Sequence, residues 1–124
     1  KALVYMRKDD YKNCIANCDV VLTLDSMNIE ANYFKGLAYC NMAKASSDAM
    51  KKSELKSAAY RKYRTEMMTY YALAEEPLEQ VRRLSPDKAS RWAPLLYQVY
   101  LNQNTGADFD EMERIIRDIK KPEK

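Results

Sequence analysis

The chain contains 124 residues, 47% of them hydrophobic, and carries a net charge of +3. These values predict one small domain, or a slice of a longer helical array, with a weak preference for an acidic partner. No stretch approaches the roughly 18 consecutive apolar residues of a membrane-spanning helix, so no span is expected within these residues. Only two glycines, four prolines and no strictly alternating runs favour an all-α fold.

The N-terminal segment, 1–28, predicts two helices joined by a polar turn. Residues 1–7 supply the end of one helix, and apolar residues at steps of three and four predict a second helix over 11–24. Asp9 or Asp10 is the expected N-cap of that second helix. Because residue 1 already lies inside a predicted helix, we expect the sequence to be a piece of a longer protein.

The middle segment, 29–86, predicts a longer pair of helices. The first covers 29 to about 44 and ends at a break over 45–48. The second runs from about 53 to 84 without a change of phase, and Pro77 is expected to kink it or split it in two. Its apolar stripe consists of Leu55, Ala59, Tyr63, Met67, Tyr70, Ala74, Leu78 and Val81.

The last segment, 87–124, predicts two further helices. One covers 90–101, and an amphipathic helix follows over 109–119. The polar segment 102–108 between them, which contains Gly106, is expected to form a turn.

An internal repeat connects these segments. Segment 1–5, which ends at Tyr5, matches segment 35–39, which ends at Tyr39, at three of its five positions. Later pairs share a second, longer spacing: Val21 with Val81, Leu24 with Leu84, and Asn32 with Trp92. The excess of the second spacing over the first predicts an insertion in the middle repeat, near 44–70. Gly36, placed in mid-helix, indicates close approach of a neighbouring helix.

The spacing of Tyr5 and Tyr39 equals the period of tetratricopeptide repeat (TPR) proteins, about 34 residues, and the chain resembles that family. Gly36 and Tyr39 match the glycine and tyrosine of the family pattern in the middle repeat, and Trp92 matches its tryptophan in the last. Asn32 departs from the tryptophan position, and no repeat is perfect. The segment Trp92-Ala93-Pro94-Leu95-Leu96-Tyr97 is similar to one found in helical-repeat proteins of the Bacteroides type with a lengthened middle hairpin. Those relatives are frequently exported, but nothing in these residues assigns a location.

The resemblance implies an antiparallel helix-hairpin solenoid of about five to six helices, a TPR-like superhelix within one domain, 1–124. Its repeats are expected at 1–28, 29–86 and 87–124. Such proteins bind and scaffold other proteins, so the resemblance implies a protein or peptide partner without naming one.

Chemistry at an active site is not expected. The chain has no histidine, so the usual serine and cysteine dyads are absent, and it has no glycine-rich phosphate loop. Cys14 and Cys18 share one helix face and amount to half a metal site, but no further ligands complete a tetrahedral set. With Cys40 they are better explained as small buried thiols. We therefore expect no enzyme activity, no metal and no cofactor.

The best candidate site is an aromatic groove on the first helices of the repeats, which in this family line a concave surface. The residues expected there are Tyr33, Phe34, Leu37, Asn41, Tyr97 and Tyr100. Grouped exposed aromatic residues are typical of binding hot spots. The alternative is that the inserted hairpin folds over them and buries them as core.

Two other functions are weighed against peptide binding. The exposed ends of a repeat array could pair with other copies of the chain, which would make it a structural self-association element. More distantly, the basic helix over 51–64, with Tyr60 and Tyr63, has the residue types that grip phosphates and stack on bases. Nucleic acid is the less favoured partner because Tyr63 belongs to the apolar stripe.

Overall fold

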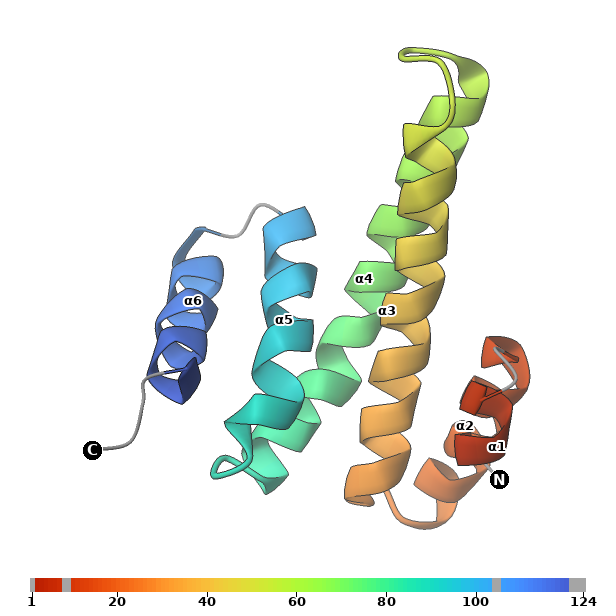
Figure 1. The fold of residues 1–124 in the computed structure, drawn as a ribbon. Coiled ribbons are helices and arrows are strands. Elements are labelled where there is room, and N and C mark those ends of the chain that lie inside the picture. Colours follow the sequence, from red (N-terminus) through yellow and green to blue (C-terminus); the bar gives the residue numbers. More distant parts are fainter. Residues whose placement is uncertain (1, 8–9, 104–105, 121–124) are drawn as a thin grey trace.

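The computed structural model describes residues 2–7, 10–103 and 106–120. Every regular element in these residues is a helix, which confirms the all-α fold class (Figure 1). The helices are α1 (Ala2–Arg7), α2 (Tyr11–Leu24), α3 (Ile29–Lys51), α4 (Ala58–Leu84), α5 (Ala89–Gln103) and α6 (Gly106–Lys120). Asp10 is the N-cap of α2, where its carboxylate accepts from the Asn13 amide, whereas Asp9 lies outside the described residues.

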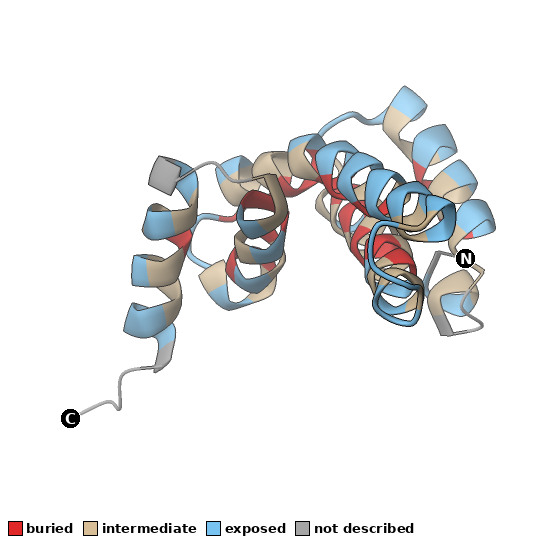
Figure 2. Cartoon of the chain, turned by 90° about the horizontal axis from the view of Figure 1, so that it is seen from above, coloured by how far each residue is buried: buried red, intermediate tan, exposed pale blue. Residues whose placement is uncertain are grey.

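The helices form a curved row, with each helix packed against the next one in the chain (Figure 2). In addition, α3 contacts both α1 and α5, so the first, third and fifth helices are neighbours along the row. The central pair, α3 and α4, is much the longest and packs as an antiparallel hairpin whose end stands clear of the other helices (Figure 1).

Gly36 allows the two long helices to approach closely. A Cβ atom at this position would lie only 2.5 Å from Cγ of Leu78, a side chain that is fully buried in the hairpin. The mid-helix glycine therefore has the packing role expected of it, which offsets its cost of about 1 kcal/mol relative to alanine.

The hairpin differs from the sequence prediction at its far end. The expected break over 45–48 is wrong, because α3 continues to Lys51 with Ser46 buried against α4 and donating to the Glu66 carboxylate (3.3 Å). The second helix begins later than expected, at Ala58, where the Ser57 hydroxyl accepts from the Tyr60 amide.

Other features of α4 also depart from expectation. The apolar stripe is buried at Met67, Ala74, Leu78 and Val81 but only partly at Tyr70, and Leu55 lies in the connecting loop with 73% of its surface exposed. Pro77 does not split the helix, which runs unbroken to Leu84. At the other end of the chain, helices cover most of the turn expected over 102–108, because α5 continues to Gln103 and α6 begins at Gly106.

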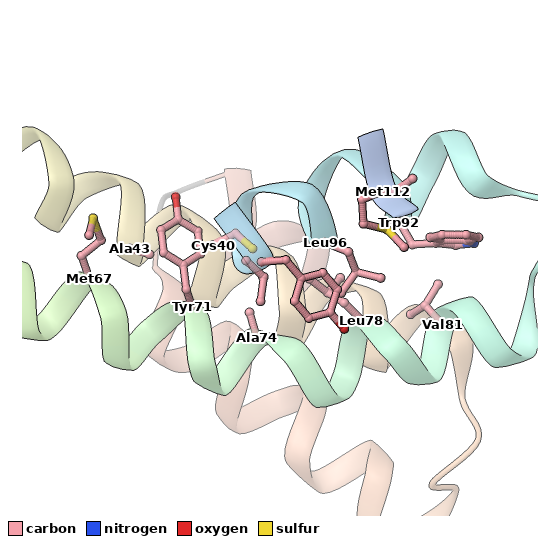
Figure 3. Close-up of a cluster of buried hydrophobic side chains, with 13 residues drawn as sticks. Cys40, Ala43, Met67, Tyr71, Ala74, Leu78, Val81, Trp92, Leu96 and Met112 are labelled. Carbon is pink, nitrogen blue, oxygen red and sulfur yellow. The ribbon is translucent and has the colours of Figure 1, made fainter. Parts of the chain in front are cut away.

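Two hydrophobic clusters stabilise the row. The larger joins α3, α4, α5 and α6, and Figure 3 shows Met67, Tyr71, Ala74, Leu78 and Val81 projecting from one side of α4 into it. The smaller joins α1, α2 and α3, and its fully buried members are small: Cys14, Cys18, Ala31 and Ala38. The α3 helix contributes to both clusters and so connects the two halves of the molecule.

The turns that precede α3 and α5 have the same hydrogen bonds at equivalent positions of the longer repeat. Asp25 N–H donates to the Val21 carbonyl at 2.8 Å, and Ser85 N–H donates to the Val81 carbonyl at 2.8 Å. A side chain from the following helix also donates back to each turn. Asn32 donates to the Ser26 carbonyl (3.2 Å), and the Trp92 indole donates to the Ser85 carbonyl (2.8 Å). The longer of the two spacings seen in the sequence therefore corresponds to a repeat of local backbone geometry.

Candidate functional site

The α3 helix packs against its neighbours on two faces, and the candidate groove occupies a third that no described helix fully covers. Gly36, Cys40 and Ala43 face α4, whereas Ala31 and Ala38 face α2. The steps of four from Tyr33 through Leu37 to Asn41 place these residues on the third face, where all three are partly exposed. The structure therefore brings three of the six expected site residues into one line.

Tyr33 is partly covered by an ion pair that bridges α3 and α5. The Arg91 guanidinium lies 3.9 Å from the centre of the Tyr33 ring and donates to both carboxylate oxygens of Glu30, at 2.6 and 2.7 Å. The hydrogen bond from Arg91 lowers the pKa of Glu30, and the same bond raises the pKa of Arg91. Tyr33 therefore lies beneath a contact between α3 and α5, and only part of its ring faces solvent.

Phe34 lies between the candidate groove and the smaller cluster. Its ring meets Tyr33 edge-on, with ring centres 5.5 Å apart, and it packs against the α1–α2–α3 cluster. It also lines a hollow of about 270 Å³ together with Leu3 and Val21. Phe34 thus faces the N-terminal end of the row, away from α5.

The two tyrosines expected on α5 have different environments. Tyr97 is partly exposed and packs against Phe109 of α6, with ring centres 4.9 Å apart. Tyr100 is only 4% exposed, and its hydroxyl donates to the Glu79 carboxylate on α4. Burial, reinforced by this bond, raises the pKa of Tyr100. The expectation that Tyr100 lines the groove is wrong, because Tyr100 lies on the face of α5 that packs against α4.

Two hollows adjoin each other along this face. One of about 360 Å³ lies between α3 and α5 and is lined by Asn41, Leu95 and Gln98 among others. The other, of about 530 Å³, lies between α5 and α6 and is lined by Pro94, Tyr97 and Gln98 together with side chains of α6. Gln98 borders both hollows, so they lie next to each other on α5. We call this surface the α3–α5–α6 furrow.

A further groove, of about 390 Å³, was not foreseen from the sequence. It lies between α2 and α4, with α3 as its floor, and Tyr39, Leu73, Pro77 and Arg83 are among its lining residues. Helical geometry places Tyr39 and Asn41 on nearly opposite sides of α3, so this groove and the furrow face away from each other. The sequence feature that points to this groove is Leu73, an apolar residue that lies outside the predicted buried stripe. Leu73 is 48% exposed.

The three cysteines are the small buried thiols that the sequence predicted. Burial raises the pKa of Cys14 from its ordinary value and raises the pKa of Cys18 and of Cys40 to about 12. Thiols held in the neutral form are poor nucleophiles and poor metal ligands. Within the described residues, no three histidine, cysteine or acidic side chains are arranged to hold a metal ion.

Comparison with known proteins identified no relative. No family model matches the chain, and neither a curated protein nor a solved structure is significantly similar to it. No helix in the part of the chain that the structure describes is long and apolar enough to cross a membrane.

Proposed function

We propose that the chain is a protein-interaction module that holds a peptide or protein segment in the α3–α5–α6 furrow. The observation that carries this proposal is that two neighbouring hollows, one on each side of α5, share Gln98 as a border. A furrow that crosses a helix suits a partner segment longer than a single side chain. Ligand sites combine apolar walls with a few polar groups that fix orientation, and this lining has both.

The furrow offers two kinds of contact. Pro94, Tyr97 and Ile116 supply an apolar end suited to one or two large side chains of the partner. Asn41 and Gln98 carry amide groups that both donate and accept, which suits the backbone of a bound segment. Lysine, aspartate and arginine side chains at the margins would then favour partners with charges of both signs.

The resemblance to tetratricopeptide repeats supports the same reading. The turns before α3 and α5 share their hydrogen bonds, as expected if the two helices begin equivalent repeats with an insertion between them. In that family the first helices of successive repeats line the peptide-binding surface. The furrow lies on α3 and α5, which are the first helices of the second and third repeats in this interpretation.

The test begins with selection of peptides from a displayed library against the purified chain. Dissociation constants of a selected peptide are then measured for Tyr97→Ala, Gln98→Ala and wild type. We expect Tyr97→Ala to weaken binding at least tenfold, because truncation of an aromatic hot spot costs about 2 kcal/mol or more. Thermal melts of each variant show whether the loss reflects binding or unfolding.

Matched controls lie on the opposite groove, where Leu73→Ala and Arg83→Ala change exposed residues of α4. These variants should leave binding unchanged. If selected peptides instead lose affinity with the α4 variants and retain it with Tyr97→Ala, the binding surface is the α2–α4 groove. If the library yields no peptide above background, the proposal of a peptide-binding furrow fails.

A further inference from the structure

The positive charge of the molecule is concentrated at the far end of the α3–α4 hairpin. Residues 44–66, which we call the basic tip, contain seven lysines and arginines against three acidic residues, a net charge of +4. The whole chain carries +3, so the remaining residues sum to −1. The tip comprises the last two turns of α3, the connecting loop and the first turns of α4, and it projects beyond α5 and α6 (Figure 1).

All seven cations of the basic tip are exposed: Lys44, Lys51, Lys52, Lys56, Arg61, Lys62 and Arg64. Within the described residues none of them lies in an ion pair, whereas Lys35, Arg82 and Arg91 of the body are paired with carboxylates. Unpaired like charges held close together repel one another, so the approach of an anionic surface is favourable.

An exposed leucine lies in the loop of the basic tip, between two of its lysines. Leu55 is 73% exposed in the loop between Lys52 and Lys56. The loop is held in place by the Ser57 cap of α4 and by the Arg61 guanidinium, which donates to the Lys56 carbonyl at 2.8 Å. Lys56 has a φ of 67°, a left-handed conformation that is costly for a lysine. An apolar residue is therefore presented to solvent by an ordered loop.

We propose that the basic tip docks on an anionic lipid surface, with Leu55 entering the boundary between headgroups and acyl chains. Lysine and arginine near anionic lipids contribute about 1 kcal/mol each, and an inserted apolar side chain adds to this. Nucleic acid accounts for the cations but gives Leu55 no role. Stacking on single-stranded bases would also need open aromatic rings, whereas Tyr60 and Tyr63 are partly buried and Lys62 lies 5.7 Å from the Tyr63 ring.

The shape of the α3–α4 hairpin suits docking on a lipid surface. A projecting end touches a flat surface without hindrance from the rest of the molecule (Figure 1). The α3–α5–α6 furrow shares Lys44, Ser47, Asp48 and Lys51 with the basic tip, whereas Lys52, Leu55 and Lys56 do not line either of its hollows. Variants at Lys52, Leu55 and Lys56 therefore test lipid docking separately from the proposed peptide binding.

The test is co-sedimentation of the purified chain with vesicles of phosphatidylcholine, with and without phosphatidylserine. We expect binding only to the vesicles that contain phosphatidylserine, weakened by added salt. Replacement of two cations, Lys52→Gln with Lys56→Gln, should reduce the partition coefficient about thirtyfold, given the contribution of each cation. Leu55→Ser should reduce it several-fold, and proportionally more at high salt, where insertion rather than charge dominates.

Matched controls change the same residue types elsewhere. Lys12→Gln with Lys88→Gln removes two exposed lysines of the body, and Leu24→Ser removes a leucine that is 85% exposed on α2. Both controls should bind vesicles as wild type does. Absence of binding to phosphatidylserine vesicles at low salt overturns the proposal, as does an equal loss in the control variants. Binding to a single-stranded oligonucleotide that depends on Lys52 and Lys56 but not on Leu55, without vesicle binding, assigns the tip to nucleic acid instead.

Discussion

The two ends of the α3–α4 hairpin are built from the same kind of helix but have opposite environments. At the base, Leu78 is fully buried and α2 and α5 flank the pair. At the tip, the connecting loop stands clear of the other helices, and Leu55 is largely exposed (Figure 1). The difference shows that burial of the stripe depends on flanking helices as well as on its phase. Leu55 continues the apolar pattern of the sequence, but it lies in the loop before α4, where no described helix covers it.

The largest effect is expected from a substitution at the base of the α3–α4 hairpin. Leu78→Ala should lower the free energy of unfolding by about 2–5 kcal/mol, because it leaves a cavity among close-packed helices. Leu55→Ala removes the same atoms at the tip and should change it by less than about 0.5 kcal/mol. Urea denaturation followed by circular dichroism measures both. Similar losses at the two sites would mean that the tip is packed in solution, contrary to the comparison.

A smaller effect tests the close approach at the base. Gly36→Ala should cost about 1–3 kcal/mol in unfolding free energy, because the new methyl group meets Leu78 and outweighs the gain in helix propensity. In the Leu78→Ala background the same change should cost less or become favourable, since the obstructing atoms are gone. A double-mutant cycle measures this coupling. Additive effects would show that Gly36 is not limited by Leu78.

A further effect uses pH to test burial at the base of the hairpin. Burial raises the pKa of Cys40 to about 12, so the folded state keeps its thiol proton where the unfolded chain loses it. The unfolded state then binds fewer protons, and stability falls as pH rises from about 9 towards 12. The difference in Tm between wild type and Cys40→Ala should therefore narrow over this range. A constant difference would indicate that Cys40 titrates normally in the folded chain.

The fold class and several local features follow from the sequence alone. Phase and composition predict helices, and helical periodicity places Met67, Ala74 and Val81 on one buried face because side chains three or four residues apart lie together. Gly36 was correctly assigned to a close helix contact, since few other reasons place a glycine in mid-helix. The longer repeat spacing corresponds to turns that share their hydrogen bonds, because turn geometry is set largely by local residues.

Features that depend on contacts between helices were decided only by the tertiary structure. Ser46, Ser47 and Asp48 are weak helix formers, yet contacts with α4 carry α3 through them to Lys51. Tyr97 and Tyr100 are both aromatic residues on one helix, and only the positions of α4 and α6 make one a surface residue and the other core. The furrow, the α2–α4 groove and the isolation of the basic tip likewise depend on distances between helices. No local pattern encodes those distances, because they result from packing of the whole row.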